Sequence, residues 1–138
     1  MTPAETAGSL HIDCPTGLAG DMLLAGLLDL GGPMDVIETP LAQLGLKDRV
    51  RLDLEETRSG GLRGRRLSVV GLESDPPHRH WAEIRSQLQN APLEPRLQQT
   101  VMAVFTALAE AEATVHGQTP ESVHFHEVGA IDALVDVV

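Results

Sequence analysis

Two alternating segments joined by glycines constrain the fold of this chain most strongly. In RVRLDLEETR, residues 49–58, Val50, Leu52 and Leu54 alternate with charged residues, which predicts a half-buried strand. Ser-Gly-Gly then leads into LRGRRLSVVGLE, residues 62–73, which is also typical of a strand. Together the two segments predict a β-hairpin, and any fold for this chain must accommodate it.

Before the hairpin, the pattern predicts one strand and two helical stretches. Residues 9–14, SLHIDC, alternate as a strand does. A turn, PTGLAG, precedes a helix in which Asp21 serves as N-cap or first-turn carboxylate and which Gly31 ends. A second helical stretch runs from Pro33 to Gly45, and we expect Pro40 to kink or split it. Its predicted apolar positions are Val36, Ile37, Leu41 and Leu44.

After the hairpin, two helices, a short strand and a last helix are predicted. Residues 81–90 place Trp81, Ile84 and Leu88 on one helical face. The next helix follows Pro95 and ends at Gly117. Its predicted apolar stripe is Leu97, Val101, Val104, Leu108, Ala111 and Val115. Residues 121–125 are typical of a short strand, and residues 129–138 begin another helix.

This order of elements predicts an α+β fold with the split βαβ, or ferredoxin-like, arrangement. Residues 1–8 are expected to be a flexible leader, and residues 9–138 a single domain. The last helix reaches Val138 without a capping signal, so we expect it to be truncated and the chain to be a fragment of a longer one.

Composition excludes several classes of function. The net charge of −10 disfavours binding to nucleic acid or anionic membranes, and no apolar run is long enough to span a bilayer. The single cysteine, Cys14, excludes an internal disulfide, and without a secretory signal a cytoplasmic location is expected. The only basic cluster is interpreted as a solvated hairpin face or as a phosphate-contacting edge; it comprises Arg58, Arg63, Arg65 and Arg66.

The densest set of possible metal ligands lies in VHFHEVGAIDALVDV, residues 123–137. On an extended strand His124 and His126 project from the same face, and on a helix Asp132 and Asp136 share a side. Glu127 lies between the two elements. Imidazoles with carboxylates suit Zn, Ni, Mn or Fe(II). The alternative is that the histidines are surface residues, that Asp132 favours the helix dipole and that Asp136 is solvated.

Further candidates lie elsewhere in the chain, each with a simpler alternative. His116 and Glu112 share a helical face, although a histidine near a helix C-terminus is also favoured by the dipole. His78 and His80 lie in a loop that could contact an anion or a metal. In DCPTGLAGDM the carboxylates of Asp13 and Asp21 would suit a divalent cation. The turn glycines Gly17 and Gly20 would bind substrate there, whereas Cys14 is expected to be a small buried hydrophobe.

Two long motifs of this chain closely resemble a known family. They are IDCPTGLAGDMLLAGLLDLG and EAEATVHGQTPESVHFHEVGAIDALVDVV, and with them the similarity covers nearly the whole chain from about Leu10. The family is the nickel insertion protein of the nickel-pincer nucleotide cofactor, also called pyridinium-3,5-bisthiocarboxylic acid mononucleotide nickel chelatase. Members of the family continue past Val138 into a further part of the N-terminal region and a C-terminal domain.

The resemblance implies a lyase-class chelatase that inserts Ni(II) into a pyridinium bisthiocarboxylate mononucleotide. It further implies CTP with Mn or Mg, bound mainly outside this segment, and a product used by lactate racemase and related enzymes. The segment would then be inactive without the missing C-terminal domain, and we expect a homo-oligomer. Two rival hypotheses stay open: a structural or assembly module with no activity of its own, and a metal-dependent phosphohydrolase using Asp13 and Asp21 with the histidine pair.

Overall fold

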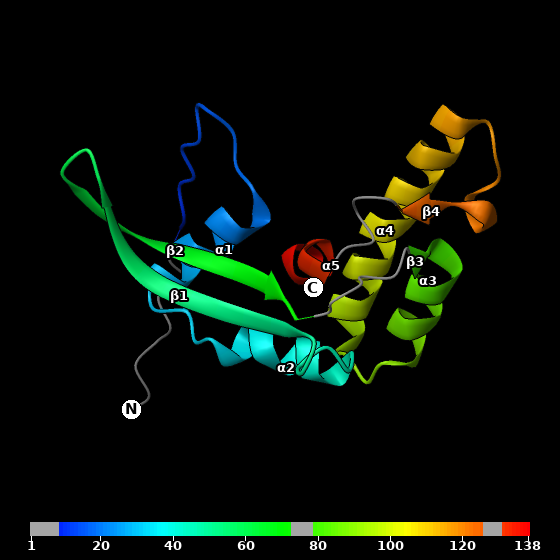
Figure 1. Ribbon diagram of the computed structural model, residues 1–138, viewed down its shortest axis with the longest axis horizontal. Coiled ribbons are helices and arrows are strands. Elements are labelled where there is room, and N and C mark those ends of the chain that lie inside the picture. The colour runs from blue at the N-terminus through cyan, green and yellow to red at the C-terminus, as the bar shows by residue number, and fades with distance from the viewer. Residues whose placement is uncertain (1–8, 73–78, 126–130) are drawn as a thin grey trace.

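The predicted hairpin forms the longest β-structure of this computed structural model, which describes residues 9–72, 79–125 and 131–138 (Figure 1). Strands β1 (Val50–Ser59) and β2 (Leu62–Gly71) pair antiparallel from Val50↔Gly71 to Ser59↔Leu62. The two-residue turn needs positive φ at both positions, and Gly60 and Gly61 have φ of 56° and 82°. The hairpin prediction is therefore confirmed.

Two helices precede the hairpin, and the first contacts β2. Helix α1 (Gly20–Asp29) begins with Asp21 in its first turn, as predicted, and α2 (Asp35–Gln43) ends before Gly45, which has φ of 70°. Of the two predicted effects of Pro40, a kink or a split, the split does not occur, because α2 is a single helix with Pro40 buried inside it. Burial of the proline ring offsets the backbone hydrogen bond that proline cannot donate. Val36, predicted to be a core position, is exposed.

Two further helices pack against each other on the other side of the molecule (Figure 1). Helix α3 (Trp81–Asn90) has the predicted bounds, and α4 (Pro95–His116) ends at Gly117 in the left-handed conformation. The predicted stripe of α4 is only partly right, because Val104 and Val115 are exposed. Its buried residues instead recur every four positions, at Val101, Phe105, Ala109 and Ala113.

Short elements complete the fold between these two parts. Strands β3 (Arg79–His80) and β4 (His124–Phe125) pair antiparallel, with the 3₁₀ helix η1 (Pro120–Ser122) before β4. Helix α5 (Ile131–Val137) contacts both α1 and β2. None of the described helices is both long enough and apolar enough to cross a membrane.

The α+β class is confirmed, whereas the predicted ferredoxin-like sheet is not formed by the described residues. Residues 9–14 carry no strand, so the described strands make two separate pairs, β1 with β2 and β3 with β4. Leu10 and Ile12 are both about half exposed. A strand can form only where a partner satisfies its backbone groups, and the alternating pattern of residues 9–14 does not identify one.

Candidate functional site

Two histidines from distant segments meet at the small β3–β4 ladder. His80 and His124 are paired residues of the two strands, and their ring centroids lie 3.8 Å apart at an interplanar angle of 51°. The backbone N–H of Trp81 donates to the carbonyl of Val123 at 3.1 Å, which extends the pairing. The structure therefore brings together one histidine from each of the two predicted histidine motifs.

Buried aromatic side chains fix the position of this histidine pair. Trp81 directly follows His80, and Phe125 directly follows His124, so in each strand a histidine is succeeded by a buried ring. Trp81, Phe105 and Phe125 pack with centroid separations of 6.4 to 6.5 Å. These are the only Trp, Phe or Tyr residues of the chain. Such aromatic packing fixes the position of both strands and hence of both imidazoles.

The histidine pair is open to solvent. His124 is exposed and His80 is partly exposed, and the backbone N–H of His80 donates to the Glu83 carboxylate at 3.3 Å. Metal–imidazole bonds are about 2.0–2.1 Å long, so the two rings would have to move slightly apart from this contact for each to supply one nitrogen to the same ion. A borderline metal ion bound in that way would keep its other positions free.

The carboxylates of the terminal motif lie on α5 and face the start of α1. Asp132 and Asp136 are exposed residues of α5, one turn apart. Asp136 packs so closely on Gly20 that a Cβ on Gly20 would lie 2.4 Å from the Asp136 Cγ. Partial burial raises the pKa of the Asp136 carboxyl, and the nearby charges of Asp21 and Asp132 raise it further.

The two sequence motifs thus meet where α5 packs on α1. Gly20 and Asp21 meet Asp136, whereas His124 pairs with His80. Among the described residues, no group of three or more histidine, cysteine or acidic side chains is arranged to hold a metal ion. Three predicted ligands lie outside the described residues: His78, His126 and Glu127.

The remaining candidates lie apart from these two groups. Asp13 is in the exposed segment before the Pro15–Thr16 turn, and the backbone N–H of Gly17 donates to the carbonyl of Cys14 at 3.1 Å. Cys14 is exposed, so the prediction that it is buried is wrong. On α4, His116 and Glu112 lie 3.2 Å apart and bind each other, on the shared face that their spacing predicts.

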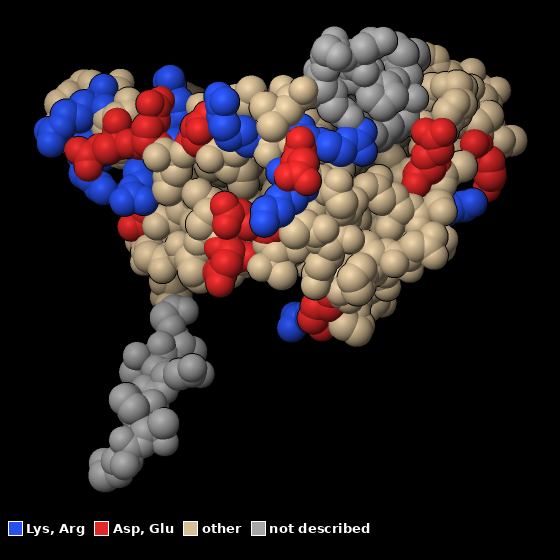
Figure 2. Space-filling model, turned by 60° about the horizontal axis from the view of Figure 1, so that its bottom comes forward, with Lys and Arg blue, Asp and Glu red and all other residues tan. Residues whose placement is uncertain are grey.

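The basic cluster attaches the hairpin to α1. Asp29 of α1 lies 2.8 Å from the Arg63 guanidinium and 3.3 Å from that of Arg65, and Glu56 lies 3.2 Å from Arg63. Hydrogen bonds to Asp29 and then to Glu56 raise the pKa of Arg63. In Figure 2 acidic and basic side chains are interleaved at one end of the molecule. All four arginines are exposed, as a solvated face requires, and two of them, Arg63 and Arg65, also bind Asp29.

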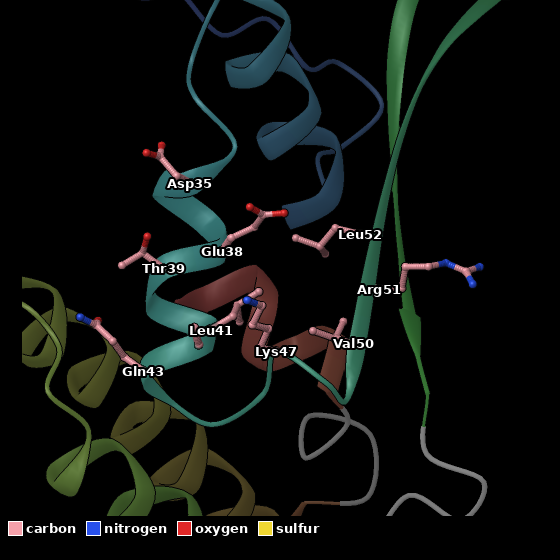
Figure 3. A pocket seen from close by; sticks show the side chains of 10 residues that line it. Asp35, Glu38, Thr39, Leu41, Gln43, Lys47, Val50, Arg51 and Leu52 are labelled. Atoms are coloured by element: carbon pink, nitrogen blue, oxygen red, sulfur yellow. The ribbon is translucent and has the colours of Figure 1, made fainter.

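Two grooves flank the hairpin. The first, of about 690 Å³, lies between α2 and β1, with Leu41, Val50 and Leu52 among its lining residues (Figure 3). It contains none of the predicted site residues. The second, of about 660 Å³, lies between α1 and β2 and includes Asp21. Of the two, only the α1–β2 groove adjoins the carboxylates that α5 brings to α1.

Sequence reasoning did not predict that His80 would pair with His124. A signal was present, because both histidines are followed at once by an aromatic residue, in His80-Trp81 and His124-Phe125. In a chain with only three such rings, these two dipeptides indicate strands that share one core contact.

Comparison with known proteins agrees with the resemblance seen in the sequence. The family model described as "Nickel insertion protein" matches residues 10–138. A relative from Gloeobacter violaceus that is named as a nickel insertion protein is 48% identical over 129 residues, covering 93% of this chain and 31% of the relative. A second such relative, from Thermomicrobium roseum, is 46% identical over 128 residues, covering 93% of this chain and 31% of the relative.

A third relative carries a more specific name. It is the "Pyridinium-3,5-bisthiocarboxylic acid mononucleotide nickel insertion protein" of Akkermansia muciniphila, 39% identical over 136 residues, covering 94% of this chain and 34% of the relative. The chain therefore spans about a third of the length of the relatives it matches. No solved structure gives a significant match.

Proposed function

The chain belongs to the nickel insertion protein family, and on that premise we propose that it binds Ni(II) for insertion into a pyridinium bisthiocarboxylate mononucleotide. The name of the Akkermansia relative contains that substrate. In the proposal, this chain is the N-terminal part of a longer cytoplasmic chelatase, and Ni(II) is its cargo. The product would serve lactate racemase and related enzymes, as the family resemblance implies.

The observation that supports this proposal is the paired arrangement of His80 and His124. An insertion protein must hold Ni(II) and then release it, so a closed cage of ligands would defeat its purpose. Two imidazoles 3.8 Å apart, centroid to centroid, leave the other positions of the ion free for sulfur and oxygen atoms of a substrate. Transfer then becomes an exchange of ligands, in which donors of the substrate replace imidazoles one at a time.

The carboxylates form the second part of the proposal. Asp132 and Asp136 of α5, with Asp21 of α1, would attract the ion after it leaves the histidines, because like charges held close together favour a bound cation. His126 and Glu127 are proposed as additional ligands, on the motif alone. Asp13, His78, His116 and Glu112 are kept as further candidates, and Gly17 and Gly20 as substrate contacts.

CTP and its Mn or Mg, which the resemblance implies, are proposed to bind mainly in the part of the relatives beyond this chain. The described residues offer no group of three or more ligands that fits a resident divalent ion. We therefore assign no step of CTP chemistry to this chain.

Calorimetric titration of the 138-residue chain with Ni(II) at pH 7.5 tests the proposal. The variants His80→Ala and His124→Ala should each lower the affinity at least ~10-fold, because even loss of an outer contact to a metal ligand costs 10–100-fold. His11→Ala is the matched control, since His11 is an exposed histidine in the segment before α1 and is not among the candidate ligands. Equal affinity in the wild type and both strand variants would refute the role of the histidine pair.

A second candidate function is a module for assembly with the rest of the protein or with further copies. The observation in its favour is the exposure of large apolar side chains, with Leu30 71% and Leu62 77% exposed. Size-exclusion chromatography with and without chelator separates the two functions. An oligomer that is indifferent to both nickel and chelator supports assembly, whereas a monomer in both conditions counts against it.

A further inference from the structure

The groove between α1 and β2 has a lining that differs in charge from one end to the other. It has a volume of about 660 Å³. Asp21 lies at the start of α1, whereas Asp29 is its last residue and binds Arg63 and Arg65 at the hairpin. Asp21 is also close enough to Asp136 for their charges to interact. One end of the groove is therefore acidic, and the other is lined by arginines of the hairpin.

The arginines at the basic end are not all neutralised by partners. Arg65 lies 3.3 Å from Asp29 and helps to hold the hairpin to α1. Arg66 lines the groove and forms no ion pair with any described residue. The Arg66 guanidinium is therefore available to an anion, and the planar fork of arginine suits phosphate oxygens.

Two glycines keep the groove open. Gly26 of α1 and Gly64 of β2 both line it, and a Cβ on either would meet nothing within 4 Å. Gly26 lies inside a helix, where glycine costs about 0.5–1 kcal/mol relative to alanine. Gly26 has no positive φ, so its backbone conformation does not require glycine. The helix is therefore less stable than it would be with alanine at this position, without a conformational reason. Free space for a ligand is a physical reason for such a residue.

We propose that the α1–β2 groove binds a pyridine mononucleotide, with the phosphate at Arg66 and the substituted ring toward Asp21. This inference rests on the proposed function, because it identifies where the substrate of that reaction lies. It explains why the acidic end of the groove adjoins Asp136: the ring substituents that receive the ion would lie beside the carboxylates that attract it. Arg66 would hold the anionic end of the molecule away from those carboxylates.

The test uses pyridinium-3-carboxylic acid mononucleotide as the probe and calorimetry of the 138-residue chain without metal. Arg66→Gln should weaken binding about 10-fold, the size expected for loss of one charge-assisted hydrogen bond. Gly26→Leu should abolish binding by filling the groove while the chain stays folded by circular dichroism. Arg51→Gln is the matched control, because Arg51 lies on the same hairpin, is exposed and binds Asp53.

Unchanged affinity in both Arg66→Gln and Gly26→Leu, or no binding by the wild type, would overturn the assignment. Inorganic phosphate should bind more weakly than the mononucleotide, and equal affinity would also overturn it. A Ni(II) titration of the same variants separates this inference from the proposed function. Normal nickel binding with no mononucleotide binding refutes the groove alone, whereas the reverse result refutes nickel binding and leaves the groove standing.

Discussion

Two glycines of helix α1 should respond in opposite ways to the same substitution. Gly20 begins the helix and lies against Asp136, whereas Gly26 lies six residues later and faces open space. Helix propensity alone predicts that alanine stabilises both positions by about 0.5–1 kcal/mol. The packing of α5 on α1 predicts that only Gly26→Ala does so.

The size of the effect at Gly20 follows from three distances. A Cβ on Gly20 would lie 2.4 Å from Cγ, 2.6 Å from Cβ and 2.7 Å from Oδ1 of Asp136. Carbon atoms in contact are normally about 3.5–4.0 Å apart, so the gap is too short by about 1 Å. A new rotamer cannot relieve it, because the Asp136 Cβ is itself too close. Overpacking costs about 1–3 kcal/mol, so Gly20→Ala should destabilise by about 0.5–2 kcal/mol after the propensity gain.

Urea unfolding followed by the fluorescence of Trp81 measures both variants, since Trp81 is the only tryptophan and is 3% exposed. Adding Asp136→Gly to Gly20→Ala removes the offending Cβ and should make the effect of Gly20→Ala smaller than it is in the wild-type background. Adding Asp136→Ala removes Cγ and Oδ1 but leaves the Cβ at 2.6 Å, so it should relieve the effect only in part. If Gly20→Ala is as stabilising as Gly26→Ala, the contact between α1 and α5 described above is wrong.

Three other predictions concern the charge of Asp136, the core residue Phe105 and Gly117 at the C-terminal end of α4. Burial raises the pKa of Asp136, so above the ordinary aspartate pKa of about 3.9 the folded chain keeps a proton that the unfolded chain has lost. The contribution of this group to the free energy of unfolding therefore falls as the pH rises above that value. Asp136→Asn should thus be more stable than wild type at pH 7 but not at pH 3, by urea unfolding at both pH values. Phe105→Ala should cost about 3–5 kcal/mol and also weaken Ni(II) binding in calorimetry, because Phe105 packs against the rings that anchor the histidine strands. Gly117→Ala should cost about 1–2 kcal/mol in thermal or urea unfolding, since Gly117 has φ of 62°.

Local patterns predicted the elements of this fold well. The alternation of residues 49–58 and the glycine turn specify the hairpin, and Pro95 and Gly117 mark the ends of α4. Each signal depends on residues close in sequence, so a single sequence contains it in full.

Predictions that depended on distant contacts succeeded less often. The apolar stripe of α4 was misassigned because alanines and valines at several positions give similar helical patterns, and the choice among them depends on which face α3 covers. Val101 and Phe105 are buried there, whereas Val104 and Val115 are not. Residues 9–14 alternate like a strand, but alternation does not say what the strand pairs with.

The candidate site also combines features that depend on local sequence with features that depend on distant contacts. The sequence identified the residue types and motifs, including both His80 and His124, but spacing along one segment suggested ligands within residues 123–137. The structure pairs His124 with a histidine 44 positions earlier and places Asp136 against Gly20, whereas His126 and Glu127 lie outside the described residues. Long-range pairing of this kind depends on the aromatic contact between the two strands, which the dipeptides His80-Trp81 and His124-Phe125 indicate only when they are considered together.

The most direct test of nickel binding by the histidine pair is paramagnetic broadening of the amide NMR signals of the chain. At a small fraction of one equivalent, Ni(II) should broaden first the signals of β3 and β4, around His80 and His124, because the ion is closest to those residues. Broadening that spares both strands and begins elsewhere in the chain would contradict the account.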